Sequence, residues 1–283
     1  MDERSNPVQR PLKGRPPDLQ FHLVSKCRYP LLSHSQLQSL SFNTMRIGRN
    51  VELAVRSISP GDTGGSSIQF DVPFPGDYDE LLDQAKQATQ VALKDGIQLM
   101  EIEFPTAGLD SVPGDGEGGI EMTGSMQLIR EFCDLLIVPE KATRTRIVKM
   151  VDRVKEEDEL FIVGYPYFNV NEMLVVEELY REAVAATARQ MIIFNGELDR
   201  IRSGYYPSFF YPKLAELLTT LFPKMETVYY IHNFKGRSGG VLFRCYPGPW
   251  KVLRRLGSRY VCVHEQEDMP TLKEVALDIL SKA

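Results

Sequence analysis

Two short apolar runs, separated by a helical segment, place the tightest limit on the fold. LFIVGYP at 160–166 and MIIFNG at 191–196 are nearly continuous runs of apolar residues, as in strands that are covered on both faces. Residues 169–190 lie between them and are expected to form a helix, with Asn169 or Asn171 as its N-cap. A strand, a helix and a strand in this order form a right-handed crossover between parallel strands. The sequence therefore predicts a parallel sheet with helices packed on it.

The same alternation extends over most of the chain. Further helices are predicted at 78–96, 125–138, 210–221 and 269–282, and further strands at 97–105, 144–151, 227–234, 239–247 and 259–267. Asp77 and Thr271 are the expected N-caps of the first and last helices. The turn at 235–238 predicts an antiparallel hairpin. We expect an α/β fold: a single, doubly wound, mostly parallel (mixed) sheet with helices on both faces, Rossmann-like, ending in a C-terminal antiparallel hairpin.

The N-terminal part of the chain differs in composition from the rest. Residues 19–57 contain five basic residues, six serines and one acidic residue, a composition typical of organelle transit peptides. We therefore interpret 1–57 as a transit peptide or a disordered basic tail, although the acidic Asp2 and Glu3 are unusual for a plastid address. Residues 58–76, rich in Gly, Ser and Pro, are expected to be a linker. The α/β domain is predicted to span 77–283.

The charge distribution limits the possible partners. The net charge of the chain is −5, but residues 1–60 carry nine basic and four acidic residues, so the remainder has a net charge of −10. A negatively charged body repels phosphates. Nucleic acid is therefore not expected as a partner.

Three loops follow the predicted strands, at 105–124, 164–171 and 195–208, where ligands bind in sheets of this class. The first is rich in Gly and Asp, but no Lys or Arg occurs between Gln98 and Ile129. It has neither the Walker pattern nor the GxGxxG spacing that holds phosphates. We favour a flexible connection, with a ligand or partner site as the alternative.

Two other segments are candidates for contacts with a partner. Tyr205, Tyr206, Phe209 and Phe210 form a dense aromatic group in and after the third loop. The segment 234–255 surrounds the only tryptophan with basic residues, and its candidates are Arg237, Arg244 and Trp250. Tyr, Phe, Trp and Arg are common anchors of interfaces. The alternatives are packing at a sheet edge for the aromatic group, and a core position for Trp250 with solvated charges around it.

No catalytic constellation emerges from the sequence. There is no GxSxG motif, and the four cysteines and four histidines lack the spacings of metal sites. Cys262 and His264 lie two residues apart on one strand, without a third group to orient them. We therefore expect no catalytic residue, no cofactor and no metal ion.

Several segments together resemble a known domain family. They are LMEIEFPTAGLD, QLIREF, ELFIVGYPYFNVNEM, QMIIFNGELD and YYIHNFKGRSGGVLFRCYPGPWKVLR, which lie between about 75 and 280. They are similar to an uncharacterised domain family of plants, algae and cyanobacteria. It includes the chloroplast low photosystem II accumulation protein 3 and the C-terminal extension of a plastid adenylate kinase. The resemblance supplies no catalytic residues.

The resemblance implies a chloroplast location, in the stroma or at the stromal face of the thylakoid. For some members it implies a role in photosystem assembly. We therefore expect a non-catalytic accessory factor that binds a protein client or other assembly factors, with a possible peripheral contact with the membrane. The alternative is a nucleotide- or phosphometabolite-binding enzyme that uses the loops at the carboxyl ends of the strands.

Overall fold

A computed structural model describes residues 71–112, 118–137, 141, 144–147, 154–166, 171–236, 239–257 and 259–282. Its centre is an eight-stranded mixed sheet with the strand order β2-β3-β4-β1-β5-β6-β7-β8. The strands are β1 (Leu99–Glu103), β2 (Thr145–Ile147), β3 (Leu160–Gly164), β4 (Gln190–Phe194), β5 (Glu226–Asn233), β6 (Gly240–Cys245), β7 (Trp250–Leu256) and β8 (Arg259–Gln266). The strands β2, β3, β4, β1 and β5 pair in parallel, in that order across the sheet. From β5 to β8 the pairing is antiparallel.

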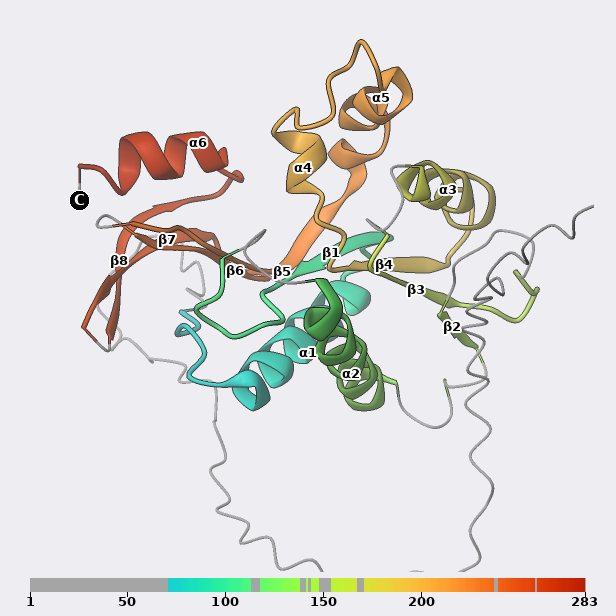
Figure 1. Ribbon diagram of the computed structural model, residues 1–283. Helices are drawn as coiled ribbons and strands as arrows, with labels where there is room; N and C mark the ends of the chain where they lie inside the picture. Colours follow the sequence, from blue (N-terminus) through green and yellow to red (C-terminus); the bar gives the residue numbers. More distant parts are fainter. Residues whose placement is uncertain are drawn as a thin grey trace, which may run out of the picture.

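Helices cover both faces of this sheet (Figure 1). They are α1 (Tyr78–Lys94), α2 (Gly118–Leu136), α3 (Glu172–Leu179), α4 (Asp199–Arg202), α5 (Pro212–Thr220) and α6 (Leu272–Glu274). The helices α1 and α2 pack on one face, where the largest apolar cluster lies. On the other face α3, α4 and α5 cover the parallel strands, and α6 covers the antiparallel ones. The predicted α/β architecture, with one doubly wound mixed sheet, is thus confirmed.

Local sequence signals explain several element ends. The Asp77 side chain accepts a hydrogen bond from Glu80 N at 2.8 Å and caps α1, and Thr271 caps α6 through Glu274 N at 3.1 Å. Both predicted caps are confirmed. The helices predicted at 169–190 and 269–282 continue as π-helical turns, Tyr180–Val184 after α3 and Val275–Ile279 after α6.

The antiparallel part of the sheet is larger than the predicted hairpin. The strand β7 was not predicted, because its basic residues indicated a surface patch. Alternation directs Trp250 and Val252 into the apolar cluster on one face and Leu253 into the cluster on the other, and the distal Leu256 is exposed. With β7 in place, β5 to β8 form a continuous antiparallel meander.

The predicted address at 1–57 and most of the predicted linker lie outside the described residues. The described end of that linker, 71–76, is extended and lies against the core. The Phe74 ring contacts Phe243 and Tyr260, with ring centroids 5.7 and 4.2 Å apart. Asp71 also pairs with Lys251 at 2.6 Å. Residues from 71 onward therefore belong to the packed unit. Within the described part of the chain, no helix is long and apolar enough to cross a membrane.

Candidate functional site

The connections after β1 and β4 leave the sheet toward opposite faces. The connection after β1 leads to α2 on one face, and that after β4 leads to α4 and α5 on the other. In sheets of this class, ligands bind where the connections of neighbouring strands diverge in this way. Asn195 joins the two strands there: its Oδ1 accepts from Phe104 N at 3.0 Å and its Nδ2 donates to Phe104 O at 3.1 Å. Its φ of 48° lies in the left-handed region that asparagine tolerates.

An ion pair is buried beside this divergence. The Glu101 side chain on β1 is fully buried, whereas that of Arg202 on α4 is 22 % exposed. The guanidinium binds both carboxylate oxygens, at 2.7 and 2.6 Å, and the Thr227 hydroxyl donates to the second oxygen at 2.7 Å. The bidentate geometry fixes the orientation of both groups. This pair attaches α4 to the central strand.

Asp199 extends the network from α4 to β5. Its carboxylate accepts from Arg202 Nη1 at 3.2 Å and from the Tyr230 hydroxyl, and His232 Nδ1 lies 3.5 Å away. Burial acts to raise the pKa of Asp199, but the hydrogen bond from His232, the charge of Arg202 and the hydrogen bond from Tyr230 hold it below its ordinary value. Burial, followed by the nearby Asp199 charge, raises the pKa of Tyr230 well above its ordinary value.

Glu103 is the least compensated acid of the group. It follows Glu101 on the same side of β1, and it accepts a hydrogen bond from Glu197 N at 3.0 Å. Burial raises its pKa well above the ordinary value, and the charges of Glu101, Asp199 and Glu197 add to the increase. Its carboxyl group therefore keeps its proton to a higher pH than a free glutamic acid.

The aromatic loop, residues 204–211, follows α4 directly. Tyr205, Phe209, Phe210 and Tyr211 are 68, 87, 72 and 38 % exposed. The connection that carries them rises far from the sheet (Figure 1). Tyr206 is partly buried and packs against the core; its ring lies between those of Tyr205 and Tyr211, with centroids 5.1 and 5.4 Å away. The loop thus presents large apolar rings to solvent.

Several contacts give this loop a defined shape. The Tyr205 and Tyr211 amides donate to Arg200 O at 3.0 Å and Pro207 O at 2.9 Å, respectively. The Arg200 guanidinium lies 5.8 Å from the centroid of the Tyr205 ring, and its Nε is 2.5 Å from Glu197 Oε2. Gly204 has a φ of 74°, which suits glycine at the bend that starts the loop. The aromatic loop and the network share α4 as their common element.

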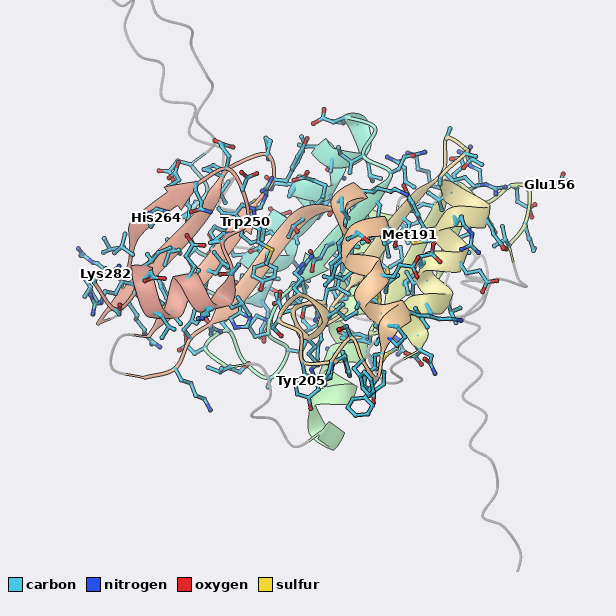
Figure 2. The ribbon with its side chains drawn as sticks, turned by 90° about the horizontal axis from the view of Figure 1, so that it is seen from above. Glu156, Met191, Tyr205, Trp250, His264 and Lys282 are labelled. Atoms are coloured by element: carbon cyan, nitrogen blue, oxygen red, sulfur yellow. The ribbon has the colours of Figure 1, made fainter. Side chains whose placement is uncertain are left out.

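The basic candidates do not join the aromatic loop. Trp250 is 2 % exposed and packs with Tyr230 in the core, at a centroid distance of 5.1 Å, so its ring is not open to a partner. The Arg244 side chain is 14 % exposed, binds Glu226 Oε1 at 2.5 Å and lies over the Trp250 ring. Figure 2 shows Trp250 among the strands and Tyr205 apart from it. Arg237 lies outside the described residues.

The described part of the loop at 105–124 is held in place. The Tyr78 hydroxyl donates to Pro105 O at 2.9 Å, and Asn233 Nδ2 donates to Leu109 O and Ser111 O, both at 2.7 Å. Arg255 and Tyr260 bind the Asp110 carboxylate. Residues 105–112 thus form a rim that these hydrogen bonds attach to α1, β5, β7 and β8, whereas residues 113–117 of the loop lie outside the described residues.

Sequence reasoning missed half of the network. The predicted loop at 195–208 includes Asp199 and Arg202, but the sequence did not identify their partners on β1 and β5. A signal was present, because Glu101 and Glu103 interrupt an otherwise apolar strand, and a charge at such a position needs a partner. Among the described residues, no group of His, Cys, Asp or Glu side chains is placed to hold a metal ion.

Comparisons with known proteins give one match. A model of the family described as Domain of unknown function (DUF1995) matches residues 75–277. A search of curated proteins and a search of solved structures found no match. The matched range contains every strand of the sheet, the ionic network and the aromatic loop. The chain therefore belongs to the DUF1995 family.

Proposed function

We propose that this protein is a non-catalytic accessory or assembly factor that binds a protein client through its aromatic loop. The observation that supports this proposal is the exposure of four large rings within seven residues, with Phe209 at 87 %. Isolated apolar residues are common on surfaces, but a contiguous aromatic group marks an interaction site. Tyr206 and the Arg200–Tyr205 contact hold the loop in shape before binding, which lowers the entropy cost of association.

The cellular setting is a further part of the proposal. We place the protein in the chloroplast, in photosystem biogenesis, on the basis of the resemblance to the low photosystem II accumulation protein 3 and the Ser- and Arg-bearing N-terminal segment. A C-terminal fluorescent fusion, followed by separation of stroma from thylakoid, tests the location. A fusion that remains in the cytosol would remove the plastid from the proposal.

The binding surface is tested by replacing its two most exposed rings. We expect Phe209→Ser with Phe210→Ser to abolish the recovery of specific proteins from a chloroplast extract. A partner identified in this way should then bind the purified variant about 30-fold more weakly, which corresponds to a loss of ~2 kcal/mol for an interface anchor. The matched control is Leu277→Ser, which removes another exposed apolar side chain, 59 % exposed and after α6.

Three outcomes are informative. Loss of partners with the double variant alone supports the aromatic loop as the binding surface. Equal recovery by wild type, double variant and control would refute that role. Sedimentation with lipid vesicles in place of any protein partner, also lost in the double variant, would assign the loop to a membrane surface.

A further inference from the structure

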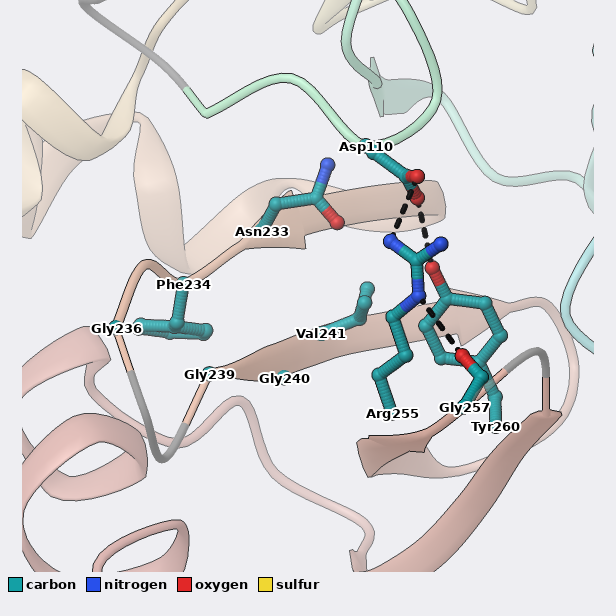
Figure 3. A pocket seen from close by; sticks show the side chains of 10 residues that line it. All are labelled: Asp110, Asn233, Phe234, Gly236, Gly239, Gly240, Val241, Arg255, Gly257 and Tyr260. Atoms are coloured by element: carbon teal, nitrogen blue, oxygen red, sulfur yellow. Dashed lines mark hydrogen bonds and ion pairs between the residues drawn. The ribbon is translucent and has the colours of Figure 1, made fainter.

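A separate cavity lies at the carboxyl edge of the sheet, away from the aromatic loop. Its volume is about 350 Å³. It is open to solvent and bordered by the ends of the β5–β6 and β7–β8 hairpins, and the rim formed by residues 105–112 contributes Asp110 (Figure 3). Ligand pockets range from about 300 to 1,000 Å³, so this cavity suits a small molecule. A dinucleotide is too large for it.

The strongest sign of a ligand site is Asn233, which is 5 % exposed and lines the cavity. Its Nδ2 donates to two carbonyl oxygens, Leu109 O and Ser111 O. Because both of these neighbours are acceptors, the atom of the Asn233 amide that faces them is the nitrogen, and this fixes the orientation of the amide. The Oδ1 atom then points toward the cavity, on the side of Arg255 (Figure 3). Among the described residues none donates a hydrogen bond to it, which leaves an oriented acceptor at the cavity surface for a ligand N–H group.

Arg255 supplies the complementary donor. Its Nη1 binds Asp110 Oδ2 at 2.7 Å, and its Nε donates to Gly257 O at 3.3 Å. The Tyr260 hydroxyl donates to the other Asp110 oxygen at 2.9 Å. These contacts hold the guanidinium at the cavity, and within the described chain its Nη2 group makes no hydrogen bond. A carboxylate is the natural acceptor for that group.

Charge balance narrows the ligand class. Arg255 and Asp110 are the charged residues among those that line the cavity, and they neutralise each other, so a ligand without net charge matches the lining best. A phosphate would bring uncompensated negative charge near the Asp110 carboxylate, whereas the carboxylate of a zwitterion is offset by the ligand's own ammonium group. Gly236 and Gly257, with φ of 99° and 63°, form parts of the rim, and a Cβ on either would meet no atom within 4 Å. The turns therefore leave the entrance free of side chains at these positions.

We propose that this cavity binds a small zwitterion of the free α-amino-acid class. The ligand ammonium donates to Asn233 Oδ1, and the ligand carboxylate accepts from Arg255 Nη2. Both contacts use groups that the protein already holds in fixed orientations, which lowers the cost of binding. The inference is independent of the aromatic loop, because it uses different elements and a different ligand.

The first experiment measures the melting temperature of the wild-type protein with each of the twenty L-amino acids. At about 100-fold excess over the dissociation constant, we expect at least one to raise the Tm by about 5–10 °C. The N-acetyl derivative and the amide of that amino acid should each lose the shift, because each lacks one of the two charged groups. AMP and ATP are included as the competing class.

The second experiment compares two arginine variants of β7. Arg255→Gln should weaken the binding of the selected amino acid tenfold or more. Arg254→Gln should leave it unchanged, because alternation directs Arg254 to the opposite face of the strand. The Arg255–Asp110 pair is more than half exposed on both sides, so Arg255→Gln is expected to fold. Its melting curve without ligand checks this point.

The side-chain amide signal of Asn233 in a ¹⁵N–¹H spectrum provides a direct reading of contact. It should shift when the selected amino acid binds to wild type and remain in place with its amide. The proposal is overturned if no amino acid raises the Tm, if only the nucleotides do so, or if both arginine variants lose binding equally. An Asn233 signal that stays unchanged at saturation would also overturn it.

Discussion

Removal of Arg202 tests the central physical argument about the network. The variant Arg202→Met keeps most of the side-chain volume and deletes the charge. It leaves the Glu101 carboxylate, which has no exposed surface, with Thr227 as its remaining hydrogen-bond donor in the network. The nearby Asp199 carboxylate, which also pairs with Arg202, then adds negative charge close to Glu101.

The structure sets the magnitude of the effect. Breaking a buried ion pair by removing one partner costs about 3–5 kcal/mol, because the other charge stays buried and uncompensated. The Arg202 guanidinium also lies over the Phe222 ring, 5.1 Å from its centroid, and the methionine keeps part of that packing. A domain of about 200 residues loses about 2–4 °C in Tm per kcal/mol. We therefore expect a decrease in Tm of about 6–20 °C.

Thermal and urea unfolding followed by circular dichroism provide the assay. The matched variant replaces both partners, Glu101→Leu with Arg202→Met. It should lie within about 1.5 kcal/mol of wild type, because the Glu101 charge is removed and Asp199 keeps Tyr230 and His232 as partners. The difference between single and double variants measures the coupling of the pair. If Arg202→Met alone lowers the unfolding free energy by less than about 1 kcal/mol, the pair is not the buried, uncompensated charge described above.

Three further perturbations test other parts of the molecule. Since the folded-state pKa of Glu103 is raised above its ordinary value, wild-type stability should fall as pH rises from about 4.5 through that pKa; Glu103→Gln should remove this loss, as seen in Tm measured from pH 4.5 to 8. Trp250→Ala should cost about 3–5 kcal/mol in urea unfolding, as for a buried aromatic residue, and a cost near zero would contradict its core position. Asp77→Ala should cost about 1 kcal/mol by loss of the α1 cap, whereas Asp79→Ala, which removes an acid without a cap bond, should change the unfolding free energy less.

Local sequence patterns predicted the central strands and the caps of α1 and α6, but not the strand β7 or the two π-helical turns. The apolar runs at 160–166 and 191–196 became β3 and β4, and both are central parallel strands. Asp77 and Thr271 act as caps because the cap depends on residues within one turn of helix. The strand β7 was missed since Lys251, Arg254 and Arg255 outweighed its apolar residues. Neither π-helical turn could be predicted, because each depends on packing of the whole helix end.

The candidate sites show the same division. Residue types within one short segment indicated an aromatic surface, and the exposure of Phe209 and Phe210 fits that interpretation. The position of Trp250 depends on the strand β7. Because Trp250 is buried there, it is not part of the aromatic surface. The Glu101–Arg202 pair joins residues 101 positions apart, and no local pattern in the sequence shows which strand lies beside α4.

By itself the sequence determined the class of fold, the caps of α1 and α6, the acidic character of the domain and the presence of one aromatic segment. These properties follow from periodicity, composition and short-range hydrogen bonds, which a few neighbouring residues specify. Only the tertiary structure decided which charges are buried together, that Trp250 is core, and that Asn233, Asp110 and Arg255 meet around one cavity. Such contacts join distant segments through strand order, because the order β4-β1-β5 places β1 between two strands that follow it by about 90 and 125 residues.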